Sequence, residues 1–206
     1  MFIKICGIRN SNELKMVEKF ADATGVVVRA PSRRAIGPEV AKEIISGAKI
    51  PVFVVSTERK LEGWMDIMDK TGASHIQVHS DMSVQEFERL RERFDGEIMK
   101  GFKVPQKCDC LRTEVEKMIR SISAYSSDYC LLDTGNGSGE LHDLRVSKWL
   151  VEELDKKVVL AGGLNSVNVG EIVRYVRPFG VDVSSGVERN KRKDEQLIKE
   201  FTEVFK

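Results

Sequence analysis

Residues 158–186 read VVLAGGLNSVNVGEIVRYVRPFGVDVSSG. An apolar run over 158–161 ends in two glycines, an amphipathic pattern follows over 166–176, and a second short strand pattern over 181–183 ends in two serines and a glycine. This order predicts a strand, a helix and a second strand. A crossover of this kind is what two neighbouring parallel strands require.

The same alternation runs along the whole chain. The expected strands lie at residues 2–6, 24–28, 52–56, 75–79, 97–102, 129–133, 158–161 and 181–183. The expected helices lie at residues 11–20, 38–46, 60–71, 83–94, 112–123, 145–154, 166–176 and 194–205. Asn10 and Ser83 stand where helix caps are expected, and Glu86 completes a capping box with Ser83.

Eight strands that alternate with eight helices predict an α/β fold, a (β/α)8 TIM barrel with short loops. No linker, low-complexity tract or charge block divides the sequence, so we expect one domain over residues 1–206. An open doubly wound sheet is the alternative. The Gly-x-Gly-x-x-Gly pattern that usually follows the first strand of such a sheet is absent from this sequence.

The charge balance limits the partners that the chain can have. It carries 33 basic and 32 acidic side chains, a formal net charge of +1. Without a broad positive field we expect neither nucleic acid nor an anionic membrane as a partner, whereas a local pocket for a small anion fits this balance. No apolar run approaches the roughly 18 to 20 residues that span a bilayer.

The cysteines indicate the redox environment. The chain has four, at 6, 108, 110 and 130, too few and too unevenly placed for the disulfide framework of a secreted domain. We therefore expect reduced thiols and a cytoplasmic protein. Cys108 and Cys110 lack a second Cys or His pair at ligand spacing, so we expect no metal site there.

Reactive and flexible residue types gather at the carboxyl ends of the expected strands. They are Cys6 and Gly7, His79, Asp133 and Thr134, Gly162 and Gly163, and Ser184, Ser185 and Gly186. In a TIM barrel the reacting groups come from these ends and from the loops that follow them. The sequence therefore predicts an active site at this mouth of the barrel.

Side-chain alternation along each strand places further polar residues on the inward face. Lys4 shares its face with Cys6, Gln77 with His79, Lys100 with Phe102, and Asp182 with Ser184. Because an unpaired charge inside a barrel is costly, we expect ion pairs among Lys4, Lys100, Asp182 and Asp133. A structural ion-pair layer and direct contact with a substrate both stay open as interpretations.

Three glycine-containing loops predict a phosphate site. The candidate phosphate-binding residues are Gly137, Ser138, Gly139, Gly162, Gly163, Ser184, Ser185 and Gly186. Glycine lets backbone N–H groups approach an anion closely, and a short helix after the eighth strand would add its dipole. The loops after strands seven and eight are also where barrels often bind phosphate.

Seven motifs follow one another along the chain. They are Lys4–Ile8 (KICGI), Ser32–Arg34 (SRR), Gln77–His79 (QVH), Leu131–Thr134 (LLDT), Gly137–Gly139 (GSG), Gly162–Asn165 (GGLN) and Asp182–Glu188 (DVSSGVE). Together they resemble the phosphoribosylanthranilate isomerase family of tryptophan biosynthesis. The resemblance runs over almost the whole chain, and its first and last motifs are the ones specific to that family.

The resemblance implies a cofactor-free isomerase that converts N-(5-phosphoribosyl)anthranilate to 1-(2-carboxyphenylamino)-1-deoxyribulose 5-phosphate by an Amadori rearrangement. By motif position, Asp133 would be the general acid at the ribose ring oxygen and Cys6 the general base at C2. Arg34 would hold the anthranilate carboxylate, for which a guanidinium fork is well shaped. His79 and Asp182 match positions of the substrate pocket.

Two other interpretations stay open. Another phosphosugar barrel, such as an epimerase, indoleglycerol-phosphate synthase or thiamine-phosphate synthase, would need metal-binding His and Asp residues, a longer amino-terminal extension or a diphosphate site. A barrel that only binds a phosphorylated ligand would tolerate loss of Cys6 and Asp133. The sequence also leaves a monomer and a homodimer open.

The sequence departs from the family pattern after two strands. Val27–Pro31 replaces the usual aromatic-rich run, and Ser56 and Thr57 end the third strand where Gly and Asn are more usual. We therefore expect the wall against the anthranilate ring to be built differently.

Overall fold

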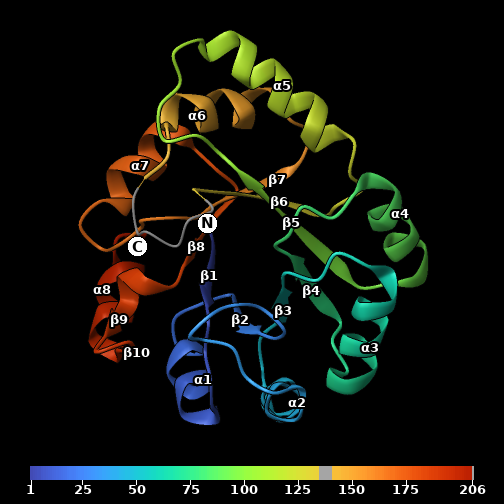
Figure 1. Ribbon diagram of the computed structural model, residues 1–206. Helices are drawn as coiled ribbons and strands as arrows, with labels where there is room; N and C mark the ends of the chain where they lie inside the picture. Colours follow the sequence, from blue (N-terminus) through green and yellow to red (C-terminus); the bar gives the residue numbers. More distant parts are fainter. Residues whose placement is uncertain (135–140, 206) are drawn as a thin grey trace. The chain divides into compact units, whose positions relative to one another are not determined.

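The structure is a computed structural model that describes residues 1–134 and 141–205 (Figure 1). Its strands are β1 (Phe2–Cys6), β2 (Ala23–Val27), β3 (Val52–Ser56), β4 (His75–Val78), β5 (Glu97–Lys103), β6 (Tyr129–Asp133), β7 (Lys157–Leu160), β8 (Gly180–Val183), β9 (Glu188–Arg189) and β10 (Arg192–Lys193). Its helices are α1 (Ser11–Val17), α2 (Pro38–Gly47), α3 (Leu61–Thr71), α4 (Val84–Arg93), α5 (Leu111–Ser123), α6 (Leu144–Glu153), α7 (Val169–Val176), α8 (Glu195–Glu203) and the 3-10 turn η1 (Ser185–Val187). The eight expected strands form, and so do the eight helices expected to alternate with them.

Strands β1 to β8 form a closed barrel in which each strand neighbours the next in chain order. The predicted fold class, an α/β barrel of alternating strands and helices, is confirmed. Strands β9 and β10 pair antiparallel after β8, a hairpin that the sequence did not predict. The expected helix after the eighth strand is only the three-residue turn η1, so no helix dipole acts there.

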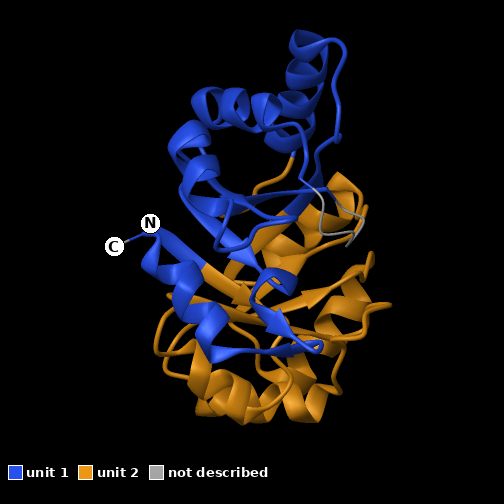
Figure 2. Ribbon diagram, turned by 90° about the vertical axis from the view of Figure 1, so that its left-hand side faces the viewer, with its two compact units in different colours: residues 1–3, 101–124, 129–206 blue, residues 4–100, 125–128 orange. Residues whose placement is uncertain are grey.

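The chain forms two compact units, which Figure 2 colours separately. Unit 1 holds residues 1–3, 101–124 and 129–206, and unit 2 holds residues 4–100 and 125–128. The single domain expected over residues 1–206 stays a prediction.

Strands β2 (ATGVV) and β3 (VFVVS) of unit 2 are mostly apolar. Every residue of β2 and β3 is buried, as expected for parallel strands covered by helices. Helices α1 to α4 lie outside these strands (Figure 1) and bury large apolar side chains such as Ile44, Trp64 and Phe87. The register aligns Cys6 of β1 with Gly25 of β2, and Gly25 with Phe53 of β3.

Helix caps follow the sequence signals in part. Asn10 caps α1 by accepting from the backbone N–H groups of Asn12 and Glu13. Ser83 caps α4 by accepting from the N–H of Glu86. The Glu86 carboxylate, however, accepts from the N–H of Leu61 at 3.0 Å, where α3 begins. The reciprocal half of the expected capping box is replaced by a bond that links two neighbouring helices.

Unit 1 carries β6 to β8 with helices α5 to α8. The register aligns Leu132 with Leu160 and Leu160 with Val181, and all three side chains are buried. Among the described residues of the whole chain, no helix is long and apolar enough to cross a membrane.

Candidate functional site

In unit 2 the carboxyl end of β1 brings a thiol and an ammonium group together. Cys6 is 9% exposed, and Lys4, two residues earlier on the same face, is fully buried. A Cβ placed on Gly25 would lie 2.8 Å from Cys6 Sγ and 3.3 Å from Lys4 Nζ, so both atoms contact the same face of this glycine. The prediction that Lys4 and Cys6 share one face of their strand is confirmed at this contact.

Gly25 therefore provides space for these two side chains. We expect Gly25→Ala to push the thiol aside, because the new methyl group would lie closer to Cys6 Sγ than a Cβ normally does. A displacement of a reacting group by about 1 Å can cost about 10²-fold in rate, so turnover should fall on that order. The check is steady-state kinetics beside Gly47→Ala, an exposed helix position with open space around it. Equal turnover in the two variants would show that Cys6 does not act from this position.

Arg34 lies in a loop that folds back onto the end of β2. The N–H of Ile36 donates to the carbonyl of Val27 at 2.9 Å, and Val27 forms an isolated parallel bridge with Ala35. The N–H of Arg34 donates to the Ser32 hydroxyl at 3.2 Å. These bonds hold the half-buried Arg34 in a turn beside the carboxyl end of β2.

His79 follows β4 and is half-buried. Its N–H donates to the carbonyl of Ser56 at 2.9 Å, and its Nδ1 lies 3.4 Å from Nε2 of the buried Gln77. Buried Lys100 of β5 donates from Nζ to the carbonyl of Ser80 at 2.9 Å and lies over the Tyr125 ring at 5.2 Å. Burial of the Tyr125 hydroxyl raises its pKa, with a smaller raising effect from Asp81.

In unit 1 Asp133 ends β6 and is half-buried. Its carbonyl accepts from the N–H of Val104 at 2.8 Å, and its Oδ1 accepts from the Thr134 hydroxyl at 3.3 Å. A Cβ on Gly162, the residue that follows Ala161 after β7, would lie 2.6 Å from this Oδ1. The Asp133 carboxylate therefore packs directly on the first glycine of the next loop.

The loops after β7 and β8 contact each other within unit 1. A Cβ on Gly186 would lie 1.9 Å from the carbonyl oxygen of Leu164, so only glycine fits between the two backbones. In the part of the chain that the structure describes, no hydrogen bond uses the N–H groups of Gly163, Ser185 or Gly186. Paired loops with unused amides are well suited to hold an anion. Gly137, Ser138 and Gly139 lie outside the described residues.

Gly163 has a φ of +68°, which makes this loop sensitive to a side chain. We expect Gly163→Ala to raise the Michaelis constant and to weaken competition by inorganic phosphate. Gly72→Ala is the matched control, because Gly72 has a φ of +70° at the end of α3 with open space around it. Both variants should lose about 1 kcal/mol or more of stability through backbone strain. Matching Michaelis constants in the two variants would exclude a phosphate contact at Gly163.

His142 begins the segment that leads into α6, and the structure gives it a specific environment. It is 4% exposed, and its Nε2 lies 2.6 Å from the Ser147 hydroxyl. Burial lowers its pKa to about 4, against the raising effects of Asp133 and Asp143. The imidazole is therefore neutral at neutral pH beside the carboxylate of Asp133. Sequence patterns alone do not distinguish this histidine from an ordinary polar residue.

The predicted burial of charged residues in the barrel strands is confirmed. Lys4, Lys100 and Asp182 are 0%, 3% and 7% exposed. Ion pairs among these groups and Asp133 stay a prediction. Lys4 Nζ also lies 5.8 Å from the centre of the Phe53 ring, a cation–π contact that attracts the buried ammonium group.

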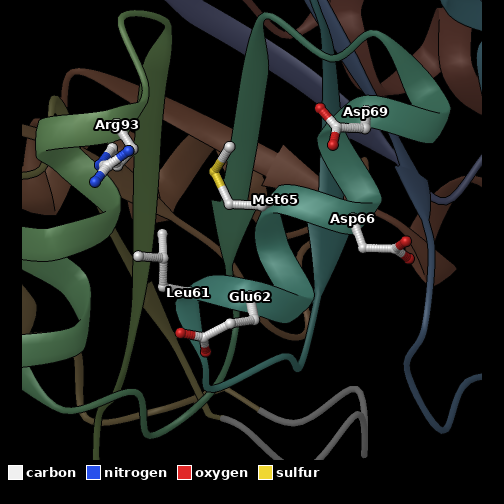
Figure 3. A pocket seen from close by; sticks show the side chains of 6 residues that line it. All are labelled: Leu61, Glu62, Met65, Asp66, Asp69 and Arg93. Carbon is white, nitrogen blue, oxygen red and sulfur yellow. The ribbon is translucent and has the colours of Figure 1, made fainter.

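A pocket of about 420 Å³ lies elsewhere in unit 2, on the outer helices α3 and α4 (Figure 3). Its lining residues are Leu61, Glu62, Met65, Asp66, Asp69 and Arg93. None of the predicted site residues lines it, so it is separate from the strand ends. Within residues 1–134 and 141–205, no group of three or more His, Cys, Asp or Glu side chains could hold a metal ion.

Known proteins and a protein-family model match this chain over almost its full length. The family model described as N-(5'phosphoribosyl)anthranilate (PRA) isomerase matches residues 3–204. A Pyrococcus abyssi protein named N-(5'-phosphoribosyl)anthranilate isomerase is 49% identical, over 98% of this chain and 96% of its own. The solved structure of the Pyrococcus furiosus isomerase of that name has a TM-score of 0.92 at 45% identity, over 99% of this chain and 98% of its own.

A further solved structure contains a bound ligand. It is a phosphoribosyl anthranilate isomerase in complex with reduced 1-(o-carboxyphenylamino)-1-deoxyribulose 5-phosphate. Its TM-score is 0.80 at 29% identity, and the match covers 99% of this chain and 97% of that one.

Proposed function

This chain belongs to the N-(5'-phosphoribosyl)anthranilate isomerase family, and we propose that Cys6 and Asp133 act as the general base and general acid of its reaction. The reaction is an Amadori rearrangement of N-(5-phosphoribosyl)anthranilate in tryptophan biosynthesis. The acid protonates the ribose ring oxygen, the C1–O bond breaks, and the anthranilate nitrogen forms a Schiff base with C1. The base then removes the C2 proton, and the electron pair of the broken C–H bond forms the C1–C2 double bond of an enolamine. Tautomerisation gives the ketose.

The contact of Cys6 Sγ and Lys4 Nζ with one face of Gly25 carries this proposal. A thiol is a weak base, whereas a thiolate can accept a proton at neutral pH. A positive ammonium group beside the sulfur stabilises the thiolate. The Lys4 side chain, fully buried on the same face, supplies that charge.

Asp133 is supported as the acid by its surroundings in unit 1. Its Oδ1 accepts from Thr134 and packs on Gly162, so the carboxyl group is held in one position at the end of β6. The nearby His142 is kept neutral by burial and therefore does not compete as a cation for this carboxylate. A positioned carboxyl group can donate a proton to a ring oxygen.

Three residues are proposed to bind the rest of the substrate. Arg34, held in the turn after β2, would form a bidentate pair with the anthranilate carboxylate. His79 and Asp182 belong to the substrate pocket by their family positions at the end of β4 and on β8. The run Val27–Pro31 stands where the family more often has an aromatic-rich run, and it contains Arg29 at a φ of +50°.

The substrate phosphate is proposed to bind at the paired loops of unit 1. Gly162, Gly163, Ser184, Ser185 and Gly186 supply backbone N–H groups and hydroxyls there. Gly137, Ser138 and Gly139, outside the described residues, belong to the same proposal. The proposed reaction needs no cofactor, because proton donation to the ring oxygen and proton removal from C2 are enough to drive the C–O cleavage and the double-bond shifts. A cytoplasmic location is part of this proposal, since the family serves amino-acid biosynthesis.

The test is turnover of freshly made N-(5-phosphoribosyl)anthranilate by the purified protein, followed as the loss of anthranilate-type fluorescence. We expect full activity after dialysis against a chelator and without any added cofactor. Failure to consume this substrate, with binding of inorganic phosphate retained, would support the phosphate-binding barrel without catalysis instead.

A further inference from the structure

Lys193 is a buried charge that lies outside the barrel strands. It belongs to β10, in the hairpin that follows the phosphate loop, yet only 1% of its side chain is exposed. The hairpin turn consists of Asn190 and Lys191, which have φ values of +51° and +62°. Two successive positive φ values are typical of a type I′ turn, which gives strands their native twist. The turn places Lys193 directly opposite Glu188 of β9.

The ammonium group of Lys193 donates to oxygen atoms of Ser184 and Glu188. Nζ donates to the Ser184 carbonyl at 3.0 Å, to the Ser184 hydroxyl oxygen at 3.3 Å and to Glu188 Oε1 at 3.1 Å. A lysine ammonium has three N–H donors and no acceptor. All three donors can therefore be used, two of them on a single residue of the phosphate loop.

These contacts determine what Ser184 can offer to a ligand. Because Nζ can only donate, the Ser184 hydroxyl oxygen accepts from it, and its own hydrogen points elsewhere. Toward a bound phosphate the hydroxyl can therefore act as the donor, because an ionised phosphate oxygen accepts hydrogen bonds. The bond from Nζ to the Ser184 carbonyl holds that carbonyl on the side of Lys193. Ser184 directly precedes the unused N–H groups of Ser185 and Gly186.

We propose that Lys193 is a positioning residue for phosphate binding, which orients Ser184 and the amides that follow it without touching the phosphate. The inference rests on the proposed function, because it assumes that the phosphate binds at this loop. Glu188, whose side chain is 5% exposed, balances the buried charge of Lys193. The hydrogen bonds from Lys193 to Ser184 therefore tie the hairpin to the loop after β8.

Substitution separates this role from plain charge balance. Lys193→Met removes the tie but also takes the opposite charge away from the buried Glu188 carboxylate, a change that destabilises proteins by itself. In the double variant Lys193→Met with Glu188→Gln the buried side chain at position 188 is neutral, and the tie to Ser184 is still absent. Lys199→Met is the matched control, since Lys199 forms an exposed pair with Glu203 on α8.

The experiment measures steady-state kinetics, competitive inhibition by inorganic phosphate and melting temperature for these variants. We expect Lys193→Met to raise both the Michaelis constant and the phosphate inhibition constant about tenfold or more, with turnover number within a few-fold of the parent. The double variant should regain melting temperature while both constants stay raised. Lys199→Met should match the parent throughout.

Three results would overturn the inference. If the double variant regains both binding constants together with its melting temperature, Lys193 only neutralises Glu188. If phosphate competes equally well in the parent and in Lys193→Met, Lys193 does not shape the site. If phosphate does not compete in the parent at all, the phosphate site assigned in the proposed function is wrong, and the role of Lys193 fails with it.

Discussion

Replacing Cys6 by alanine should reduce the turnover number by about 10²–10⁴-fold, the usual contribution of a general base. The base acts on the C2 proton in the transition state, so the Michaelis constant and phosphate affinity should change much less. Cys6→Ser should also be poor, because a hydroxyl group is a far weaker base than a thiolate at neutral pH. Steady-state kinetics and phosphate inhibition measure these effects.

Cys130→Ala provides the control for loss of a buried thiol. Cys130 is fully buried in β6 and has no proposed part in the reaction. Its truncation should lower the melting temperature and leave turnover unchanged. If Cys6→Ala keeps turnover within a few-fold of the parent, Cys6 is a packing residue and another group removes the proton.

Asp133→Asn should lower turnover by a similar factor, about 10²–10⁴-fold. The amide keeps the shape of the side chain and its packing on Gly162, but it cannot protonate the ring oxygen. The substrate should therefore still bind, and the loss should appear in the turnover number. The measurement is again steady-state kinetics, with phosphate inhibition as the readout of binding.

Asp143→Asn is the matched control for this change. Asp143 is the second carboxylate that acts on His142, and it caps α6 while pairing with Arg145. Asparagine retains the capping oxygen, so this variant should lose some stability and keep its turnover. Equal losses of turnover in Asp133→Asn and Asp143→Asn would mean that the local field, and not proton donation, is responsible.

The sequence predicted most of the fold because its signals are local. Apolar runs such as Val52–Ser56 form the strands, and Asn10 and Ser83 cap the helices that were expected after them. The capping-box prediction was wrong for Glu86, because its carboxylate accepts from the N–H of Leu61 on the preceding helix and not from the N–H of Ser83. Competition of that kind depends on which helices are neighbours, and sequence spacing does not report it.

The sequence predicts those parts of the candidate site in which the alternation of side chains along a strand shows which residues share a face. Cys6 and Lys4 share a face by simple counting, and the structure brings both against Gly25. Gly25 itself was missed, although an isolated glycine inside a strand pattern is a signal of close approach. Lys193 could not be found this way, because its contacts depend on a hairpin with positive φ values at Asn190 and Lys191, neither of which is a glycine.

In the proposed mechanism Asp133 opens the ring and Cys6 then removes the C2 proton. The most direct test is the kinetic isotope effect on turnover with substrate deuterated at C2, measured in Asp133→Asn and in Cys6→Ala. Loss of the base should make proton removal rate-limiting, so Cys6→Ala should show a large primary effect. Loss of the acid should make ring opening rate-limiting, so Asp133→Asn should show almost none. Equal effects in the two variants, or a larger effect in Asp133→Asn, would contradict the assignment.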